Sequence, residues 1–149
     1  MIQLKKIMVP TDGSETSKEA MRYALELAKP FQATITLMMV ADDRNLDWMG
    51  PAYFPEKMLN EIEKNTIEQA KRALKEFWPT AADSPETIKT LVIKGNPVEE
   101  IIDCAKREKI HMIVMGTHGR TGISHMMLGS VAEKIVRLSP CPVLTVKPR

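Results

Sequence analysis

The sequence predicts an α/β fold in which an open, doubly wound sheet of five parallel strands carries helices on both faces. Two observations lead to this prediction. Short apolar runs of strand length alternate with stretches whose apolar residues recur at helical spacing, and this alternation repeats four times before a final strand. Chains that alternate in this way form parallel sheets, because each helix carries the chain back to the start of the next strand. No internal repeat, low-complexity segment or linker is visible, so we expect a single domain over 1–149.

Residues 6–10 (KIMVP) form the first predicted strand, since this apolar run leads into turn chemistry at 11–13 (TDG). Ser14 has the side chain of a helix N-cap, which accepts a hydrogen bond from one of the first helical amides. An apolar stripe over 20–28 continues this helix. We expect the helix to end before Pro30, because proline disrupts the hydrogen bonding of an α-helix.

Residues 34–40 (TITLMMV) predict the second strand, because they are apolar and rich in β-branched residues and other strand formers. The segment 41–55 has no periodicity and is longer than an ordinary connection, so it is a loop long enough to cover a ligand. A long helix is expected over 56–78, and a third strand over 87–94 (TIKTLVIK).

Pro97 suits the first position of the next helix. Residues 112–116 (MIVMG) are short, apolar and closed by a glycine, which predicts the fourth strand. A helix then opens at 129–130 (GS), and residues 142–146 (PVLTV) form the last, short strand. The apolar residues expected to share one face of that helix are Val131, Ile135, Val136 and Leu138.

The composition excludes several classes of protein. Hydrophobic content of 44% and charged content of 27% are ordinary for a globular domain, and a net charge of +2 with mixed signs gives no nucleic-acid-binding footprint. No apolar run approaches transmembrane length, and the N-terminus lacks a signal-peptide pattern. Cys104 and Cys141 lack C-x-x-C spacing, which favours buried thiols over a disulfide or metal site. We therefore expect a cytoplasmic protein that binds neither nucleic acid nor membrane.

The strongest functional signal follows the fourth strand. Gly116, Gly119, Gly129 and Ser130 give the spacing Gly-x2-Gly-x9-Gly-Ser between a strand and a helix. This arrangement suits phosphate, because unpaired N–H groups and the helix dipole face the anion and glycines let the backbone approach it. The spacing is neither that of the P-loop nor that of the dinucleotide fingerprint. The alternative is an ordinary connection with turn glycines.

This glycine spacing closely resembles the nucleotide-binding signature of the universal stress protein family, in its ATP-binding branch. The resemblance covers the whole chain and is weakest over 42–85. PTDGSETS after the first strand resembles the family's opening turn and helix, and GSVAEKIVRLSPCPVLTV resembles its C-terminal end. The resemblance implies a Rossmann-like fold of the adenine nucleotide alpha hydrolase type. It also implies a regulatory or stress-response protein that binds ATP, with Mg²⁺ as a candidate companion of the triphosphate.

The resemblance further implies roles for individual residues. Asp12, at the turn after the first strand, would lie near the ribose, and Val40 would recognise the adenine edge through its backbone. The glycines would let the loop wrap the nucleotide, and the start of the last helix would present N–H groups and the Ser130 hydroxyl to the phosphates. Arg120 could add charge there. The implied nucleotide-binding residues are Pro10, Thr11, Asp12, Val40, Gly116, His118, Gly119, Arg120, Gly129, Ser130 and Val131.

These residue types also have purely structural uses. Asp12 is a common turn residue, Val40 suits a core, and Ser130 suits a helix cap. His118 and His125 flank the loop, but no third ligand stands at a suitable spacing. We therefore expect no protein metal site.

Three function classes remain open: a nucleotide-binding regulator, an enzyme acting on ATP, and a scaffold that binds no nucleotide, as in the family's other branch. Against an enzyme, the sequence shows no paired carboxylates near the loop, no general base beside Asp12 and no Walker lysine, so no catalytic residue is predicted. Slow ATP hydrolysis stays open, since phosphoryl transfer needs mainly positioning and charge.

The resemblance places the last strand, 142–146, at an edge of the sheet. An apolar edge must be covered or paired, which predicts a homodimer built at least partly on this strand. The alternative is that Pro140, Pro142 and Pro148 protect the edge of a monomer.

Overall fold

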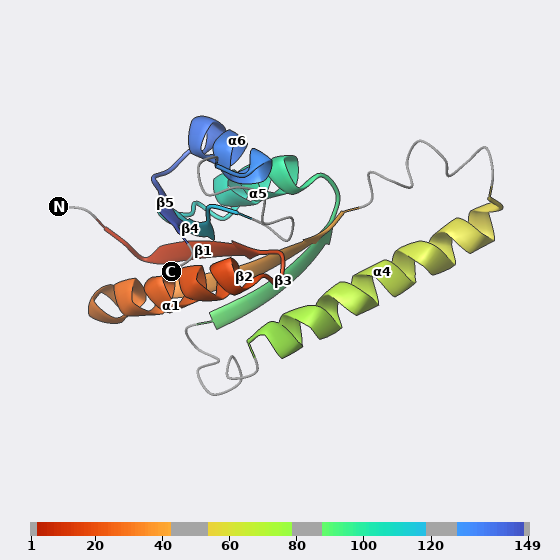
Figure 1. Ribbon diagram of the computed structural model, residues 1–149, viewed down its shortest axis with the longest axis horizontal. Helices are drawn as coiled ribbons and strands as arrows, with labels where there is room; N and C mark the ends of the chain where they lie inside the picture. The colour runs from red at the N-terminus through yellow and green to blue at the C-terminus, as the bar shows by residue number, and fades with distance from the viewer. Residues whose placement is uncertain (1–2, 43–53, 79–87, 119–127, 148–149) are drawn as a thin grey trace.

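The structure is a computed structural model that describes residues 3–42, 54–78, 88–118 and 128–147 (Figure 1). The five strands are all parallel and lie in the order β3-β2-β1-β4-β5, so the predicted open, doubly wound α/β sheet is confirmed. In chain order the elements are β1 (Lys6–Thr11), α1 (Glu15–Phe31), β2 (Thr34–Ala41), α4 (Glu56–Phe77), β3 (Ile88–Lys94), α5 (Pro97–Arg107), β4 (Met112–Gly116), α6 (Ser130–Leu138) and β5 (Val143–Val146).

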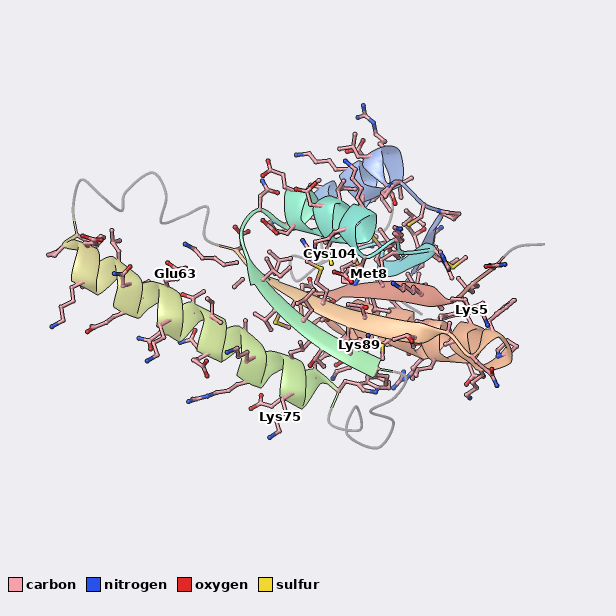
Figure 2. All side chains as sticks on the ribbon, turned by 180° about the vertical axis from the view of Figure 1, so that it is seen from behind. Lys5, Met8, Glu63, Lys75, Lys89 and Cys104 are labelled. Carbon is pink, nitrogen blue, oxygen red and sulfur yellow. The ribbon has the colours of Figure 1, made fainter. Side chains whose placement is uncertain are left out.

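The sheet separates two apolar cores, because successive side chains of a strand point to opposite faces. Ile7 and Val9 of β1 pack in the core formed with α1 and α4. Met8, between them, packs in the core formed with α5 and α6, where Cys104 of α5 also lies (Figure 2). Figure 1 accordingly shows α1 and α4 on one side of the sheet and α5 and α6 on the other.

Helix α1 contains Pro30 and ends at Phe31, so the prediction that it ends before the proline is wrong. A proline in the last turn removes only one helical hydrogen bond. The chain leaves the helix at Gln32, which takes a left-handed conformation with φ of 50°. The Gln32 N–H reaches the carbonyls of Ala28 and Lys29, so the end of the helix keeps its hydrogen bonds.

Helix α6 buries fewer apolar residues than its sequence suggested. Ile135 is fully buried and Val131 packs against the same core, but Val136 is 47% exposed and Leu138 is 58% exposed. The prediction that all four residues share the buried face is therefore wrong for two of them. Consecutive residues of a helix are about 100° apart, so Val136 cannot share the face of Ile135. Leu138 is the last residue of the helix.

Helix α4 contacts the sheet through its C-terminal half. Leu74 and Phe77 are its buried residues, whereas Met58 near its start is 46% exposed. Figures 1 and 2 show the N-terminal half extending away from the sheet. None of the helices in the described ranges is long and apolar enough to cross a membrane.

Candidate functional site

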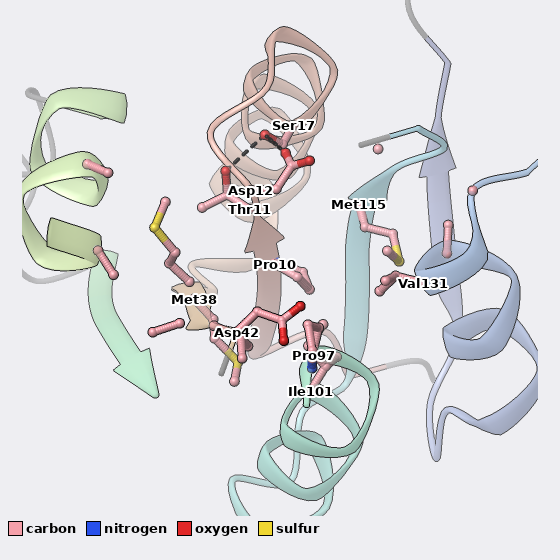
Figure 3. Close-up of a pocket in the computed structure, with 18 of the residues that line it drawn as sticks. Pro10, Thr11, Asp12, Ser17, Met38, Asp42, Pro97, Ile101, Met115 and Val131 are labelled. Atoms are coloured by element: carbon pink, nitrogen blue, oxygen red, sulfur yellow. Dashed lines mark hydrogen bonds between the residues drawn. The ribbon is translucent and has the colours of Figure 1, made fainter. Parts of the chain in front are cut away.

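A cleft of about 760 Å³ lies beyond the carboxyl ends of β1, β2 and β4. Since β1 pairs with β2 on one side and β4 on the other, this is where the strand order reverses, the place at which open α/β sheets bind ligands. Figure 3 shows α4 on one side of the cleft and α6 on the other. The predicted residues that line it are Pro10, Thr11, Asp12, Val40, Gly116, His118, Gly129, Ser130 and Val131. Gly119 and Arg120 lie outside the described residues.

The turn after β1 holds the Asp12 carboxylate in place. The Ser14 N–H donates to Asp12 Oδ1 at 3.0 Å, and the Ser17 hydroxyl lies 3.3 Å from the same oxygen. The chain can turn this tightly because Gly13 takes a φ of 83°, where residues with a Cβ are strained. The first strand therefore delivers an oriented carboxylate to the cleft.

No side chain of the described residues caps the first amide groups of α6. Its N-cap residue is Gly129, which has no side chain to accept a hydrogen bond. The helices α1 and α5 also begin near this end of the sheet, but Ser14 caps the first and Asn96 caps the second. The Gly129 N–H donates to the Thr117 carbonyl at 2.7 Å, which fixes the start of α6 beside the end of β4. Uncapped helical N–H groups suit an anion.

Gly116 lies against helix α1 at the end of β4. A Cβ on Gly116 would stand 2.8 Å from the Thr16 methyl carbon Cγ2 and 3.2 Å from the Thr16 carbonyl carbon. The glycine therefore allows close packing of α1 on β4. This requirement is separate from the loop-wrapping role that the family resemblance implied.

His118 forms part of the wall of the cleft. Its Nδ1 lies 2.8 Å from the Thr117 hydroxyl. Its Nε2 is buried and has no hydrogen-bond partner in the part of the chain that the structure describes. In the described part of the chain, no three His, Cys, Asp or Glu side chains come together as a metal site would require.

The sequence analysis missed several residues that line the cleft. Thr66, Ala70 and Ala73 of α4 follow one another at helical spacing and form one wall. This spacing was visible, but a helical stripe does not distinguish a residue facing a cleft from one facing the core. Asp42 directly follows β2 and Ser17 lies in the first turn of α1; both positions are at the carboxyl edge of the sheet.

The cleft has a largely apolar end, where Figure 3 also shows Asp42, and a polar end. Met38 and Val40 of β2, the two alanines of α4 and Ile101 of α5 line the apolar end. The Asp12 turn and the N-terminus of α6 line the polar end. Among the lining residues that the structure describes, Asp12 and Asp42 carry charge and none is lysine or arginine.

The sequence model of the universal stress protein family matches residues 3–147. Universal stress protein MJ0531 of Methanocaldococcus jannaschii is 38% identical over 143 residues, which cover 96% of this chain and 82% of that protein. The solved structure of protein MJ0577 from the same organism has a TM-score of 0.82 and 32% identity, and the match covers 99% of each chain.

Two further similar structures contain nucleotides. A universal stress protein in complex with cAMP is 25% identical, has a TM-score of 0.57, and is matched over 95% of each chain. A universal stress protein family member from Arabidopsis thaliana has AMP bound and a TM-score of 0.66, over 97% of this chain and 92% of that one. At 18% identity, the second likeness shows the shared fold alone.

Proposed function

This chain belongs to the universal stress protein family, and we propose that it is an ATP-binding regulatory protein with slow or no hydrolysis. The relative in complex with cAMP supports an adenine nucleotide as the ligand. We extend the proposal to a single domain over 1–149 that acts in a reducing cytoplasm, consistent with free Cys104 and Cys141.

One observation carries the proposal: the uncapped start of α6 opens into the same cleft as the oriented Asp12 carboxylate. An N-terminus of this kind stabilises negative charge, whereas the carboxylate would accept hydrogen bonds from sugar hydroxyls. A ligand that satisfies both walls carries hydroxyl groups and an anionic group within one molecule. A nucleotide has both.

The polarity of the cleft suggests how the nucleotide would lie. The base would occupy the apolar end near Met38 and Ile101, where backbone groups of Val40 could meet the adenine edge. The ribose would lie by Asp12, and the phosphates would reach Gly129 and Ser130. A Mg²⁺ ion that accompanies ATP usually needs one or two carboxylates besides phosphate oxygens and water, and Asp12 would fit that need.

The described lining residues include no lysine or arginine that would stabilise the charge of a transferred phosphoryl group, which supports a regulator over an enzyme. Among them His118 is the one general-base type that is not a carboxylate, and its Nδ1 lies 2.8 Å from the Thr117 hydroxyl. In such a regulator, ATP binding would change the conformation of a loop or the contacts with a partner protein.

The test has two steps. Small molecules released from denatured purified protein are first identified by chromatography. The emptied protein is then titrated with ATP and GTP by calorimetry, and we expect tighter binding of ATP. Equal affinity for both nucleotides would contradict adenine recognition near Val40, and no binding of either would overturn the proposal.

Variants at the start of α6 test the phosphate assignment. Gly129 has φ of −59° and ψ of 150°, which any residue can adopt, so a side chain there strains the backbone little. Gly129→Val should nevertheless weaken ATP binding by at least about tenfold, or about 1.4 kcal/mol, by filling the space of the anion. Ser130→Ala should cost about 0.5–1.5 kcal/mol, since the N–H groups remain. A folded Gly129→Val protein that binds ATP like the parent would refute the assignment.

We also propose a homodimer through β5. This strand lies at the edge of the sheet, and the neighbouring helix α6 exposes Val136 and Leu138. Pairing would cover both the strand edge and these side chains.

A further inference from the structure

Two buried hydroxyl groups stand behind the Asp12 turn. Thr11 is 7% exposed and Ser17 is 4% exposed, and their oxygens Oγ1 and Oγ lie 2.9 Å apart (Figure 3). Their neighbours along the chain on the same faces, Val9 and Ala20, are fully buried and apolar. Unlike these apolar neighbours, the two hydroxyls are held by hydrogen bonds to the turn that follows β1.

The hydrogen bonds of this pair lead to Asp12. The Gly13 N–H donates to Thr11 Oγ1 at 3.1 Å, so the Thr11 hydroxyl hydrogen can point to Ser17 Oγ. The single hydrogen of Ser17 then has two near acceptors, the Ser14 carbonyl at 2.8 Å and Asp12 Oδ1 at 3.3 Å. Bonds in such a chain strengthen one another, and an ionised carboxylate is the stronger acceptor.

Two of the hydrogen bonds that hold the Asp12 carboxylate reach the same oxygen. The Ser14 N–H and the Ser17 hydroxyl converge on Oδ1. Two donors on one oxygen restrict rotation of the carboxyl group, and the second oxygen, Oδ2, thereby takes a defined position. We propose that Ser17, supported by Thr11, is a positioning residue that orients Asp12 to accept a hydrogen bond from a ribose hydroxyl. This inference rests on the proposed nucleotide-binding function.

The test measures recognition of the ribose separately from nucleotide binding. ATP, 2′-deoxy-ATP and 3′-deoxy-ATP are titrated into the parent, Ser17→Ala and Thr11→Val. Ser139→Ala is the matched control, because its hydroxyl bonds the Cys141 carbonyl in the turn after α6 and does not line the cleft. Thr11→Val keeps the shape of the side chain, and Thr11→Ser keeps the hydroxyl.

We expect the parent to bind ATP at least about tenfold more tightly than the weaker deoxy analogue, as the loss of a hydrogen bond to a charged group implies. Ser17→Ala should reduce this preference to about threefold or less, with the affinity for that analogue almost unchanged. Thr11→Val should shift the preference in the same direction, and Thr11→Ser and Ser139→Ala should leave it as in the parent.

The outcomes separate the two proposals. Binding of none of the three nucleotides overturns the proposed function and this inference with it. Binding of all three with equal affinity by the parent overturns the inference and leaves the function intact. If Ser17→Ala weakens the binding of ATP and of both analogues equally, Ser17 has a structural role only, and the inference is wrong. Should Ser17→Ala not fold, an unchanged preference in Thr11→Val decides against the inference, and a reduced one decides for it.

Discussion

Replacement of Gly116 by alanine tests how closely helix α1 packs on strand β4. The added Cβ would lie 2.8 Å from Thr16 Cγ2, whereas unstrained carbon atoms lie about 3.5–4.0 Å apart. The neighbouring atom is a short branched side chain held in helix α1, and the Thr16 carbonyl carbon at 3.2 Å leaves little room for the helix to give way. Overpacking of this kind costs about 1–3 kcal/mol.

Part of this cost is offset in the unfolded state. Gly116 does not have a positive φ, so alanine can adopt its backbone conformation and gains about 0.4–1 kcal/mol by restricting the unfolded chain. We therefore expect Gly116→Ala to lower the free energy of unfolding by about 1–2 kcal/mol net. Urea unfolding measures this change at one protein concentration and without nucleotide, because a bound ligand or subunit association would each add apparent stability.

A double-mutant cycle identifies the contact. Thr16→Ser removes only the methyl carbon that the new Cβ would meet, so Gly116→Ala should cost at least about 0.5 kcal/mol less in the Thr16→Ser background. Gly95→Ala is the control: it should also destabilise, since Gly95 has φ of 146°, but without coupling to Thr16. The same loss at Gly116 in both backgrounds, or no loss at all, would refute the packing argument.

Three further expectations concern hydrolysis, assembly and thiol chemistry. Purified protein should hydrolyse ATP far more slowly than the turnover of about 10 per second that is typical of enzymes. If the protein reaches that rate, and Asp12→Ala abolishes it, the proposal of a regulatory protein is wrong. Light scattering at micromolar concentration should give twice the monomer mass of 16.8 kDa, and Leu138→Lys should shift the protein towards monomer; a parent protein at monomer mass would favour the proline-protected edge. Burial raises the pKa of the fully buried Cys104 thiol, so iodoacetamide at pH 8 should label Cys104 only after unfolding. Mass spectrometry of the native protein after treatment detects whether Cys104 is labelled. Rapid labelling of Cys104 in the native protein would show that helix α5 opens.

The parts of the fold that the sequence predicted correctly depend on local patterns. Strands such as 112–116 are short apolar runs closed by turn residues, and their alternation with helices leaves few arrangements other than a parallel sheet. The candidate site at the carboxyl edge then follows from topology, since Asp12, Val40 and Gly116 are placed there by the ends of their strands.

The details that the sequence could not predict depend on distances between elements. Ser17 resembles any polar residue in the first turn of a helix until β1 brings Thr11 to 2.9 Å from it. Gly116 resembles a loop glycine until α1 brings Thr16 against it. Pro30 stayed inside its helix because the left-handed Gln32, rather than the proline, decides where the chain turns.

The two walls of the cleft come from opposite faces of the sheet. The chain leaves β1 into α1 on one face, and it leaves β4 towards α6 on the other, as the two separate cores show. Because β1 and β4 are neighbours, their connections diverge and leave a crevice between the Asp12 turn and the start of α6. Each wall alone would bind a ligand weakly, because one provides only the carboxylate of the Asp12 turn and the other only the N-terminus of the short helix α6. Only a ligand that reaches from one wall to the other uses both, which is why we propose a whole nucleotide as the ligand in preference to its separate base, sugar or phosphate.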